Sequence, residues 1–350
     1  MPLSTTRDTK QQTNFKRHWI KRLMTVVQVK NRTNVELLPK SDSSVKGDRS
    51  MPPLRPHLGL VCITFSKEVR FRTMTRTRYL KLTEPERESA LKALYVDNLN
   101  RLNEALSFCQ QHQIQLYRIS SGLFPLSDME DEIGAKILEE MRLELACIGQ
   151  RAAELGIRLV LHPDQYVVLS SDSPQVVQSS IKILERQART FDLLGLPRSP
   201  WALMNIHGGK SQRTEQLIQV IGELPEPIRS RLTFENDEHA YSASEILEVC
   251  KRTGVPMVFD AHHHVCHEHL TSYEHPSVAE MFYAARETWQ NPEWQLVHIS
   301  NGQEAFNDRH HSDFITVMPS VYREAPWIEI EAKAKEEAIA RVQSEWLDAN

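Results

Sequence analysis

The chain has 350 residues, of which 25% are charged, and its formal net charge is −4 at pH 7. This composition is typical of a globular chain with one large domain or two ordinary ones, and the sequence contains no run of 18 apolar residues that could cross a membrane. The five cysteines form no C-x-x-C pair, and the first 30 residues lack the apolar core of a secretory signal. We therefore expect a cytoplasmic protein with reduced thiols.

The charges are divided unevenly along the chain. Residues 1–56 contain 12 lysines and arginines against 4 acidic residues, whereas residues 57–350 contain 30 against 42. The first segment is also rich in Ser, Thr, Asn and Gln. We predict a disordered or irregular basic extension over residues 1–56, which could hold nucleic acid weakly through its charge or could have no function of its own. Residues 57–350 are then the folded domain.

From His57 onward, short apolar runs alternate with segments whose apolar residues recur at helical spacing. Eight runs are predicted as strands: 58–64, 115–120, 157–162, 201–207, 231–235, 255–260, 294–298 and 327–331. The segments predicted to follow them as helices are 97–112, 133–155, 174–194, 212–221, 242–251, 277–288, 313–322 and 334–347. Eight alternating strand–helix units predict an α/β fold, a (β/α)8 or TIM barrel with a parallel sheet. No G-x-G-x-x-G motif follows a strand, so a dinucleotide site is not expected.

The strongest chemical signal lies in residues 256–267. The strand predicted there ends on Asp260, and His262, His263 and His264 follow within four residues. Imidazole and carboxylate groups packed together suit a divalent transition metal, although a solvated loop would also explain such a run. This stretch therefore predicts a metal site where the strand leaves the core.

Metal-competent side chains recur at the ends of six consecutive predicted strands. They are His162, His207, Glu235, Asp260, His298 and Glu331. In a barrel these ends form the catalytic face, so the six side chains are expected to lie together. One tetrahedral zinc uses three or four ligands, so this set predicts two or three metal ions. Clustered divalent ions suit displacement at phosphorus, because one activates water and another stabilises the leaving oxygen.

The motifs around these residues jointly resemble those of the UV-damage endonuclease family. They are His162-Pro-Asp-Gln-Tyr166, Asn205-Ile-His-Gly-Gly-Lys210, Thr233-Phe-Glu-Asn-Asp237, Phe259-Asp-Ala-His-His-His264, Val297-His-Ile-Ser-Asn301, His311-Ser-Asp313 and Glu331-Ala-Lys333. Their order and spacing match the family over about residues 57–340. The resemblance implies a TIM barrel related to endonuclease IV that nicks double-stranded DNA immediately 5′ of UV photoproducts and some other lesions. It also implies a cluster of divalent ions, commonly Mn2+, with Zn2+, Co2+ or Mg2+ as alternatives.

The resemblance also implies which residues form the site. The metal ligands carried over by motif are His162, His207, Glu235, Asp260, His263, His298, His311 and Glu331. Glu235, Glu331 and His207 are further expected to act in catalysis, with the two glutamates bridging metals and with no protein nucleophile. His263 is selected by the family's Asp-x-x-His pattern, which requires the chain to turn directly after Asp260. His262 and His264 are expected to support the ligands or to be exposed.

Several residues are expected to contact DNA. Gln165 and Tyr166 match the pair that, in the family, wedges into the duplex beside the lesion, although loop packing is the ordinary role of such a tyrosine. Residues 67–81 are predicted as a loop with six basic residues, one acid and interleaved aromatics, which suits a DNA backbone or, alternatively, a solvated surface. The DNA-binding residues expected outside that pair are Arg70, Arg72, Arg76, Lys210 and Arg309. We expect a monomer that associates with the nucleoid when it acts.

Two positions depart from the family pattern. The family's first strand often carries a Tyr and an Asn near the lesion, where this chain has Leu60 and Thr64. Some members carry a chemically modified lysine two residues before the histidine of the seventh strand, where this chain has Leu296. Any mechanism that needs that lysine cannot operate here.

Two other functions are compatible with part of the pattern. A metal-dependent sugar isomerase or epimerase on a TIM barrel would use similar ligands but fewer of them. The basic segment at 67–81 and the Gln165–Tyr166 pair argue against it. A DNA-damage binder without catalytic activity would bind a lesion duplex and leave it uncut.

Overall fold

The computed structural model describes residues 55–348 except for residues 164 and 165. The described residues belong to one compact unit, Met51–Asn350. The extension predicted for residues 1–56 lies outside them, apart from Arg55 and Pro56. Arg55 forms an ion pair with Asp348 at 2.6 Å. No helix of the described part is long and apolar enough to cross a membrane.

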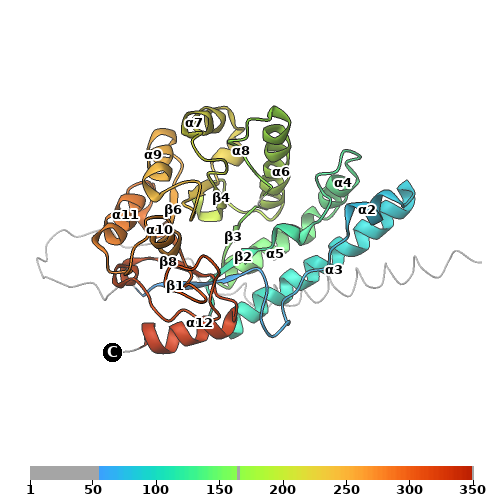
Figure 1. Ribbon diagram of the computed structural model, residues 1–350. Coiled ribbons are helices and arrows are strands. Elements are labelled where there is room, and N and C mark those ends of the chain that lie inside the picture. Colours follow the sequence, from blue (N-terminus) through green and yellow to red (C-terminus); the bar gives the residue numbers. More distant parts are fainter. Residues whose placement is uncertain (1–54, 164–165, 349–350) are drawn as a thin grey trace, which may run out of the picture. The chain divides into compact units, whose positions relative to one another are not determined.

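Eight parallel strands close into a barrel in chain order, which confirms the predicted (β/α)8 fold (Figure 1). Each strand pairs with the next, and β8 returns to β1 with Leu58 opposite Ile328. The strands are β1 (His57–Val61), β2 (Leu116–Ile119), β3 (Arg158–Leu161), β4 (Met204–His207), β5 (Leu232–Glu235), β6 (Met257–Asp260), β7 (Leu296–Ile299) and β8 (Trp327–Ile330). Each is shorter than the apolar run that predicted it, because apolar residues of the flanking turns also pack into the core.

Helices surround the barrel, and most lie where the apolar periodicity placed them. The α-helices are α2 (Arg76–Leu80), α3 (Glu84–Gln111), α4 (Ile133–Glu140), α5 (Arg142–Glu154), α6 (Pro174–Leu193), α7 (Thr214–Glu223), α8 (Glu226–Arg229), α9 (Ala243–Thr253), α10 (Ala261–His267), α11 (Pro276–Arg286) and α12 (Glu336–Val342). Short 3-10 turns lie at η1 (Ser121–Leu123), η2 (Pro200–Ala202), η3 (Pro292–Trp294) and η4 (Ser320–Glu324), and a π-turn, η5 (Gln343–Leu347), follows α12.

The helix predictions were wrong in four places. Helix α3 starts well before residue 97, because Thr83 and Glu86 form a capping box and a proline follows in the first turn. The helix predicted over 133–155 is interrupted at Met141, which adopts φ −88° and ψ 10°. No α-helix lies between β7 and β8; that segment is instead fixed by Asn301, whose Oδ1 accepts hydrogen bonds from the Thr316 and Val317 amides at 2.7 and 2.9 Å. The segment 67–81, predicted as a loop, contains α2.

The inside of the barrel has an apolar base and a polar mouth. At the base, one cluster of buried side chains contains Leu116, Val160, Leu203, Val258, Leu296 and Trp327. Because side chains alternate along a strand, the residue two positions further on points to the same interior. Those residues include Arg118, Asn205, Asp260, His298 and Glu329, which are all buried. Because each strand changes from apolar to polar side chains along its length, the ionisable side chains lie at the carboxyl ends of the strands.

Leu296, which stands where some members of the resembling family have a lysine, belongs to the apolar base and is fully buried. It lies opposite Trp327 in the pairing of β7 with β8. Its side chain therefore packs in the layer beneath His298 and offers the mouth of the barrel no polar group.

Candidate metal centre

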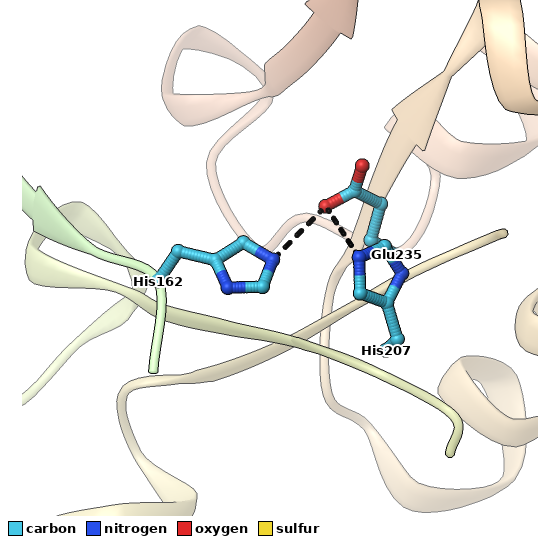
Figure 2. A group of neighbouring side chains, drawn as sticks. All are labelled: His162, His207 and Glu235. Atoms are coloured by element: carbon cyan, nitrogen blue, oxygen red, sulfur yellow. Dashed lines mark ion pairs between the residues drawn. The ribbon is translucent and has the colours of Figure 1, made fainter. Parts of the chain in front are cut away.

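Glu235, at the end of β5, lies at the centre of the polar mouth with a side chain that is 1% exposed. Its Oε2 atom faces the Nε2 atoms of His162 at 3.6 Å and His207 at 4.0 Å. Figure 2 shows the two imidazoles approaching this one oxygen from β3 and β4. Asn205 also donates a hydrogen bond from Nδ2 to Oε2 at 2.6 Å, which fixes the carboxylate. Glu235 thus shares one oxygen with a first pair of imidazoles.

The other oxygen of Glu235, Oε1, faces a second pair of imidazoles. His298 Nδ1 lies 3.1 Å away and His263 Nδ1 lies 3.3 Å away. Asp260 lies beside His263, with its Oδ2 atom 4.0 Å from Nδ1. The carboxylate of Glu235 is therefore placed between two donor sets, as a carboxylate that bridges two metal ions would be.

The position of His263 depends on the short helix α10. The Asp260 side chain caps this helix by accepting a hydrogen bond from the His263 amide at 2.8 Å. The chain therefore turns directly after Asp260, as the sequence required, and His263 rather than His262 faces Glu235.

His262 and His264 point elsewhere and are both buried. His262 hydrogen-bonds through Nδ1 to the Tyr273 hydroxyl at 2.6 Å and through Nε2 to the Asp308 carbonyl at 2.8 Å. His264 bonds to Ser277. Neither is exposed, so the expected exposure of these two histidines is wrong.

A third group of donors surrounds His298. Its Nε2 lies 2.8 Å from Glu329 Oε2, and its Nδ1 lies 3.4 Å from Glu331 Oε1. Arg118 of β2 joins this group, with Nη1 2.7 Å from Glu331 Oε1 and 3.1 Å from Glu329 Oε2. Glu331 also faces His311 Nδ1 at 4.0 Å. The guanidinium of Arg118 therefore gives this group a permanent positive charge.

Sequence reasoning missed Glu329 and Arg118. The signal for Glu329 was present, because it lies two residues before Glu331 and therefore points to the same side of β8. Arg118 had no such signal, since its partner Glu331 lies 213 residues further along the chain.

The electrostatics of the mouth is dominated by buried charge. Burial alone would raise the pKa of Glu235, but the imidazoles of His298 and His207 outweigh it and hold that pKa well below its usual value. Burial likewise opposes protonation of His298, yet Glu235 and Glu329 hold its pKa well above the usual value. The carboxylates thus stay charged, and a proton on His298 balances them when no metal is bound. A divalent cation would supply that balancing charge and displace the proton.

The donor set fits divalent metal ions. Three groups of His, Asp and Glu have ligand atoms within 4.8 Å of one another: His162, His207 and Glu235; Glu235, Asp260 and His263; and His298, Glu329 and Glu331. Buried ligand atoms without a hydrogen-bond partner among the described residues include Asp260 Oδ2 and Glu329 Oε1. A buried polar atom without a partner is costly, and a bound cation would satisfy it.

The structure brings all eight residues expected to bind metal into this one mouth. The centroids of the His162 and His207 rings are 5.2 Å apart, those of His207 and His263 are 5.7 Å apart, and those of His263 and His311 are 6.5 Å apart. These four imidazoles follow one another around the rim, with Glu235 facing three of them.

The residues expected to contact DNA are more widely spread. Tyr166 is 72% exposed on the loop after β3, while Gln165 lies outside the described residues. Lys210 and Arg213 both form ion pairs with Asp172, and these two cations lower the Asp172 pKa to about 2. Arg309 lies against His239. These groups surround the mouth on the loops that follow β3, β4 and β7.

The basic segment after β1 is separate from the metal centre. Arg72 lies 3.6 Å from Asp97, Arg70 is partly buried, and Arg76 starts α2. In Figure 1, α2 lies with the start of α3 and with α4, and a hydrogen bond of 2.7 Å from Tyr79 to Asp131 joins this group. Among the described residues, none of these three arginines forms an ion pair with a residue of the centre.

Comparison with known proteins agrees with this geometry. The family described as UV-endonuclease UvdE matches residues 56–349. The chain is 71% identical over 293 residues to a UV DNA damage endonuclease of Nostoc sp., covering 84% of this chain and 91% of that protein. It is 50% identical over 289 residues to the UV DNA damage endonuclease of Deinococcus radiodurans, covering 82% of this chain and 95% of that protein.

Solved structures show the same architecture. The crystal structure of SacUVDE superposes with a TM-score of 0.69 at 27% identity and covers 83% of this chain and 98% of that one. Endonuclease IV from Thermus thermophilus has a TM-score of 0.51 at 13% identity, covers 84% of this chain and 99% of that one, and shares the fold.

Proposed function

Since this chain belongs to the UV-endonuclease UvdE family, we propose that it is a DNA repair endonuclease that nicks duplex DNA immediately 5′ of UV photoproducts and other distorting lesions. We assign this activity to residues 57–350, and we propose residues 1–56, with 12 lysines and arginines against 4 acidic residues, as a basic extension outside the catalytic domain. The substrate is double-stranded DNA, and the protein acts as a monomer.

The observation that carries the proposal is the position of Glu235 between two donor sets. Oε2 faces His162 and His207, and Oε1 faces His263 and His298. This supports a centre of two or three divalent ions that share the Glu235 carboxylate, with His162, His207, Asp260, His263, His298, His311 and Glu331 as the other ligands. Mixed imidazole and carboxylate donors suit Mn2+, which we propose as the ion used, and Zn2+, Co2+ and Mg2+ are the alternatives.

These ligands would hold ions that would supply a more acidic water and positive charge for the phosphate and the departing 3′ oxygen. The chain's own residues hold the reaction in place. Glu235 presents one oxygen to each pair of imidazoles, and Asn205 fixes Glu235 through its 2.6 Å hydrogen bond. Arg118 holds Glu331 in position at 2.7 Å, so that this second carboxylate stays directed at the centre.

Lesion selection would then come mainly from deformation of the DNA. A photoproduct weakens stacking and pairing, so that bending and flipping cost less free energy there than in intact duplex. Tyr166 is exposed on the rim and offers an aromatic ring that can stack in the opened duplex. One site could thus accept lesions of different chemistry.

Replacing Tyr166 with alanine, alone or together with Gln165, should reduce the preference for damaged over intact duplex by about tenfold, because base–aromatic stacking is worth roughly 1–3 kcal/mol. The metal content of the protein should not change, since this exposed ring has no contact with the ligands. The measurement is the ratio of nicking rates on lesion and intact duplexes, with metal analysis of both proteins. An unchanged ratio would show that Tyr166 does not read the lesion.

The proposed function is tested by incubating the full chain with a labelled duplex that contains one pyrimidine dimer, and with an undamaged control. We expect a cut 5′ of the dimer in Mn2+ and no cut in chelator. The absence of a cut, when metal is demonstrably bound, would contradict the proposal and direct attention to a sugar isomerase, which ketose–aldose interconversion would test. Tight binding of the dimer duplex without a cut would indicate a damage binder.

A further inference from the structure

A cavity of about 210 Å³ lies beside the third donor group. Glu331 and His311 line it on the side of the metal centre, and the cations Arg118, Lys333 and Lys335 line the remainder. It therefore opens next to the residues that are proposed to hold the metal ions, between the ends of β1, β2 and β8.

The three cations differ in what they already bind. Arg118 is paired with Glu329 and Glu331, and the exposed Lys333 ammonium bonds to Gln303. Lys335 is partly buried, and its ammonium has no hydrogen bond or ion pair among the residues that the structure describes. Burial, together with the nearby charge of Arg118, lowers the pKa of Lys335, and the opposing charges of Glu331 and Glu329 only partly offset this.

The backbone holds Lys335 in an unusual conformation. Its φ is 50° and its ψ is −115°, a region that a residue with a Cβ atom rarely adopts. Such a conformation is unfavourable and persists only where the surroundings impose it, which happens most often at binding sites. The strain at Lys335 is thus a second reason to look for a ligand in this cavity.

The surroundings impose this conformation from both sides of the turn. Before it, the Lys333 and Ala334 amides donate to the Ser312 and Asp313 carbonyls at 3.1 and 3.0 Å. After it, the buried Glu336 carboxylate accepts hydrogen bonds from the Phe65 and Ser66 amides at 2.7 and 2.8 Å. The turn is therefore tied to the segment that carries His311 and to the loop after β1.

We propose that this cavity is a phosphate-binding subsite in which the Lys335 ammonium contacts one phosphate of the DNA strand beside the cut. The proposal rests on the proposed function, because it takes the bound phosphodiester to be that of the DNA substrate. A lysine supplies the compact charge with three donors that a phosphate oxygen accepts, and its position beside Glu331 would hold the strand against the metal centre. The ligand class is thus a phosphodiester anion of DNA.

The first test replaces Lys335 with methionine, which keeps the length of the side chain and removes the charge. Binding of duplex is measured with Ca2+ in place of the activating ion, over a range of salt concentrations. We expect about tenfold weaker binding. The slope of log affinity against log salt concentration should also fall by about one, because one phosphate contact is lost. The matched control is Lys251→Met. Lys251 is an exposed cation on α9 that lies 3.9 Å from Glu287, and its replacement should leave both quantities unchanged.

The second test identifies the phosphate. A single uncharged methylphosphonate is moved along the strand around the cut, and the affinity of each duplex is measured for the native protein and for Lys335→Met. We expect one position at which the native protein loses affinity and Lys335→Met loses none, because the contact is already absent. Equal losses for the two proteins at every position would overturn the proposal.

Failure of the proposed phosphate subsite can be distinguished from failure of the proposed endonuclease function. The methylphosphonate series measures binding to the duplex with one pyrimidine dimer, which sets the position of the protein, and it needs no cleavage, so it tests the subsite even if no nick is ever made. Metal content and thermal unfolding should be the same for Lys335→Met as for the native protein. This result would show that the weaker binding comes from a lost phosphate contact and not from damage to the metal centre. If the methionine variant unfolds, Lys335→Gln replaces it in both tests with the same expected result.

Discussion

Replacing Glu235 with glutamine is expected to reduce the nicking rate about 10³- to 10⁴-fold, since metal-ion catalysis contributes several kcal/mol and each 1.4 kcal/mol is a factor of about ten in rate. Glutamine keeps the shape of the side chain, but its amide nitrogen carries protons and cannot bridge two cations. The variant should also hold fewer metal ions per chain. Single-turnover nicking of the dimer duplex and elemental analysis of the same samples measure both effects.

A matched control is Glu154→Gln at the end of α5. Glu154 is exposed and accepts a hydrogen bond from Gln150 at 3.0 Å, and among the described residues none of the metal centre contacts it. This variant should keep full activity and full metal content. If Glu235→Gln retained both, the bridging role assigned to Glu235 would be wrong.

Replacing Arg118 with methionine should lower the free energy of unfolding of the metal-free protein by about 3–5 kcal/mol, because it removes the guanidinium that pairs with two buried carboxylates and leaves His298 as the one cation among the described residues within 3.4 Å of both. Arg118 is buried and lies within 3.1 Å of both Glu329 and Glu331. Bound divalent ions would replace part of the lost charge, so the loss should shrink when Mn2+ is added. Denaturant unfolding with chelator and with Mn2+ measures the two values.

The control for this experiment is Arg252→Met. Arg252 is exposed on α9 and pairs with Glu215 and Glu248, so its removal should change stability by less than about 1 kcal/mol in either condition. A loss for Arg118→Met that is the same with and without metal would show that the guanidinium and the ions do not share one cluster of charge.

The barrel and the location of its chemistry could be predicted from sequence because the signals are local. Each apolar run ends on a polar residue at the point where the strand leaves the core, as at His207, Glu235 and Asp260, and closure of a parallel barrel brings all those ends to one face. The turn after Asp260 was implied only by the resemblance, whose Asp-x-x-His pattern selects His263, because His263 can face the centre only if the strand stops there.

Other features depend on contacts between distant parts of the chain. The charge balance of the third donor group depends on Arg118, whose partners are brought to it only by closure of the barrel between β8 and β1. His311 lies on a segment without an α-helix, and its place is fixed by the bonds of the Asn301 side chain and by the bridge between Gly302 and His311. Only the resemblance to a family indicated His311. No periodicity could have indicated the strained backbone of Lys335.

The central claim is that several divalent ions, held on both sides of Glu235, cut the DNA. The most direct test titrates Mn2+ into metal-free protein and follows, in the same samples, the ions bound per chain and the rate of nicking at a single pyrimidine dimer. We predict that nicking stays at background through the first equivalent and rises as the second binds. Full activity with one ion per chain, or a rate that survives in chelator, would contradict the account.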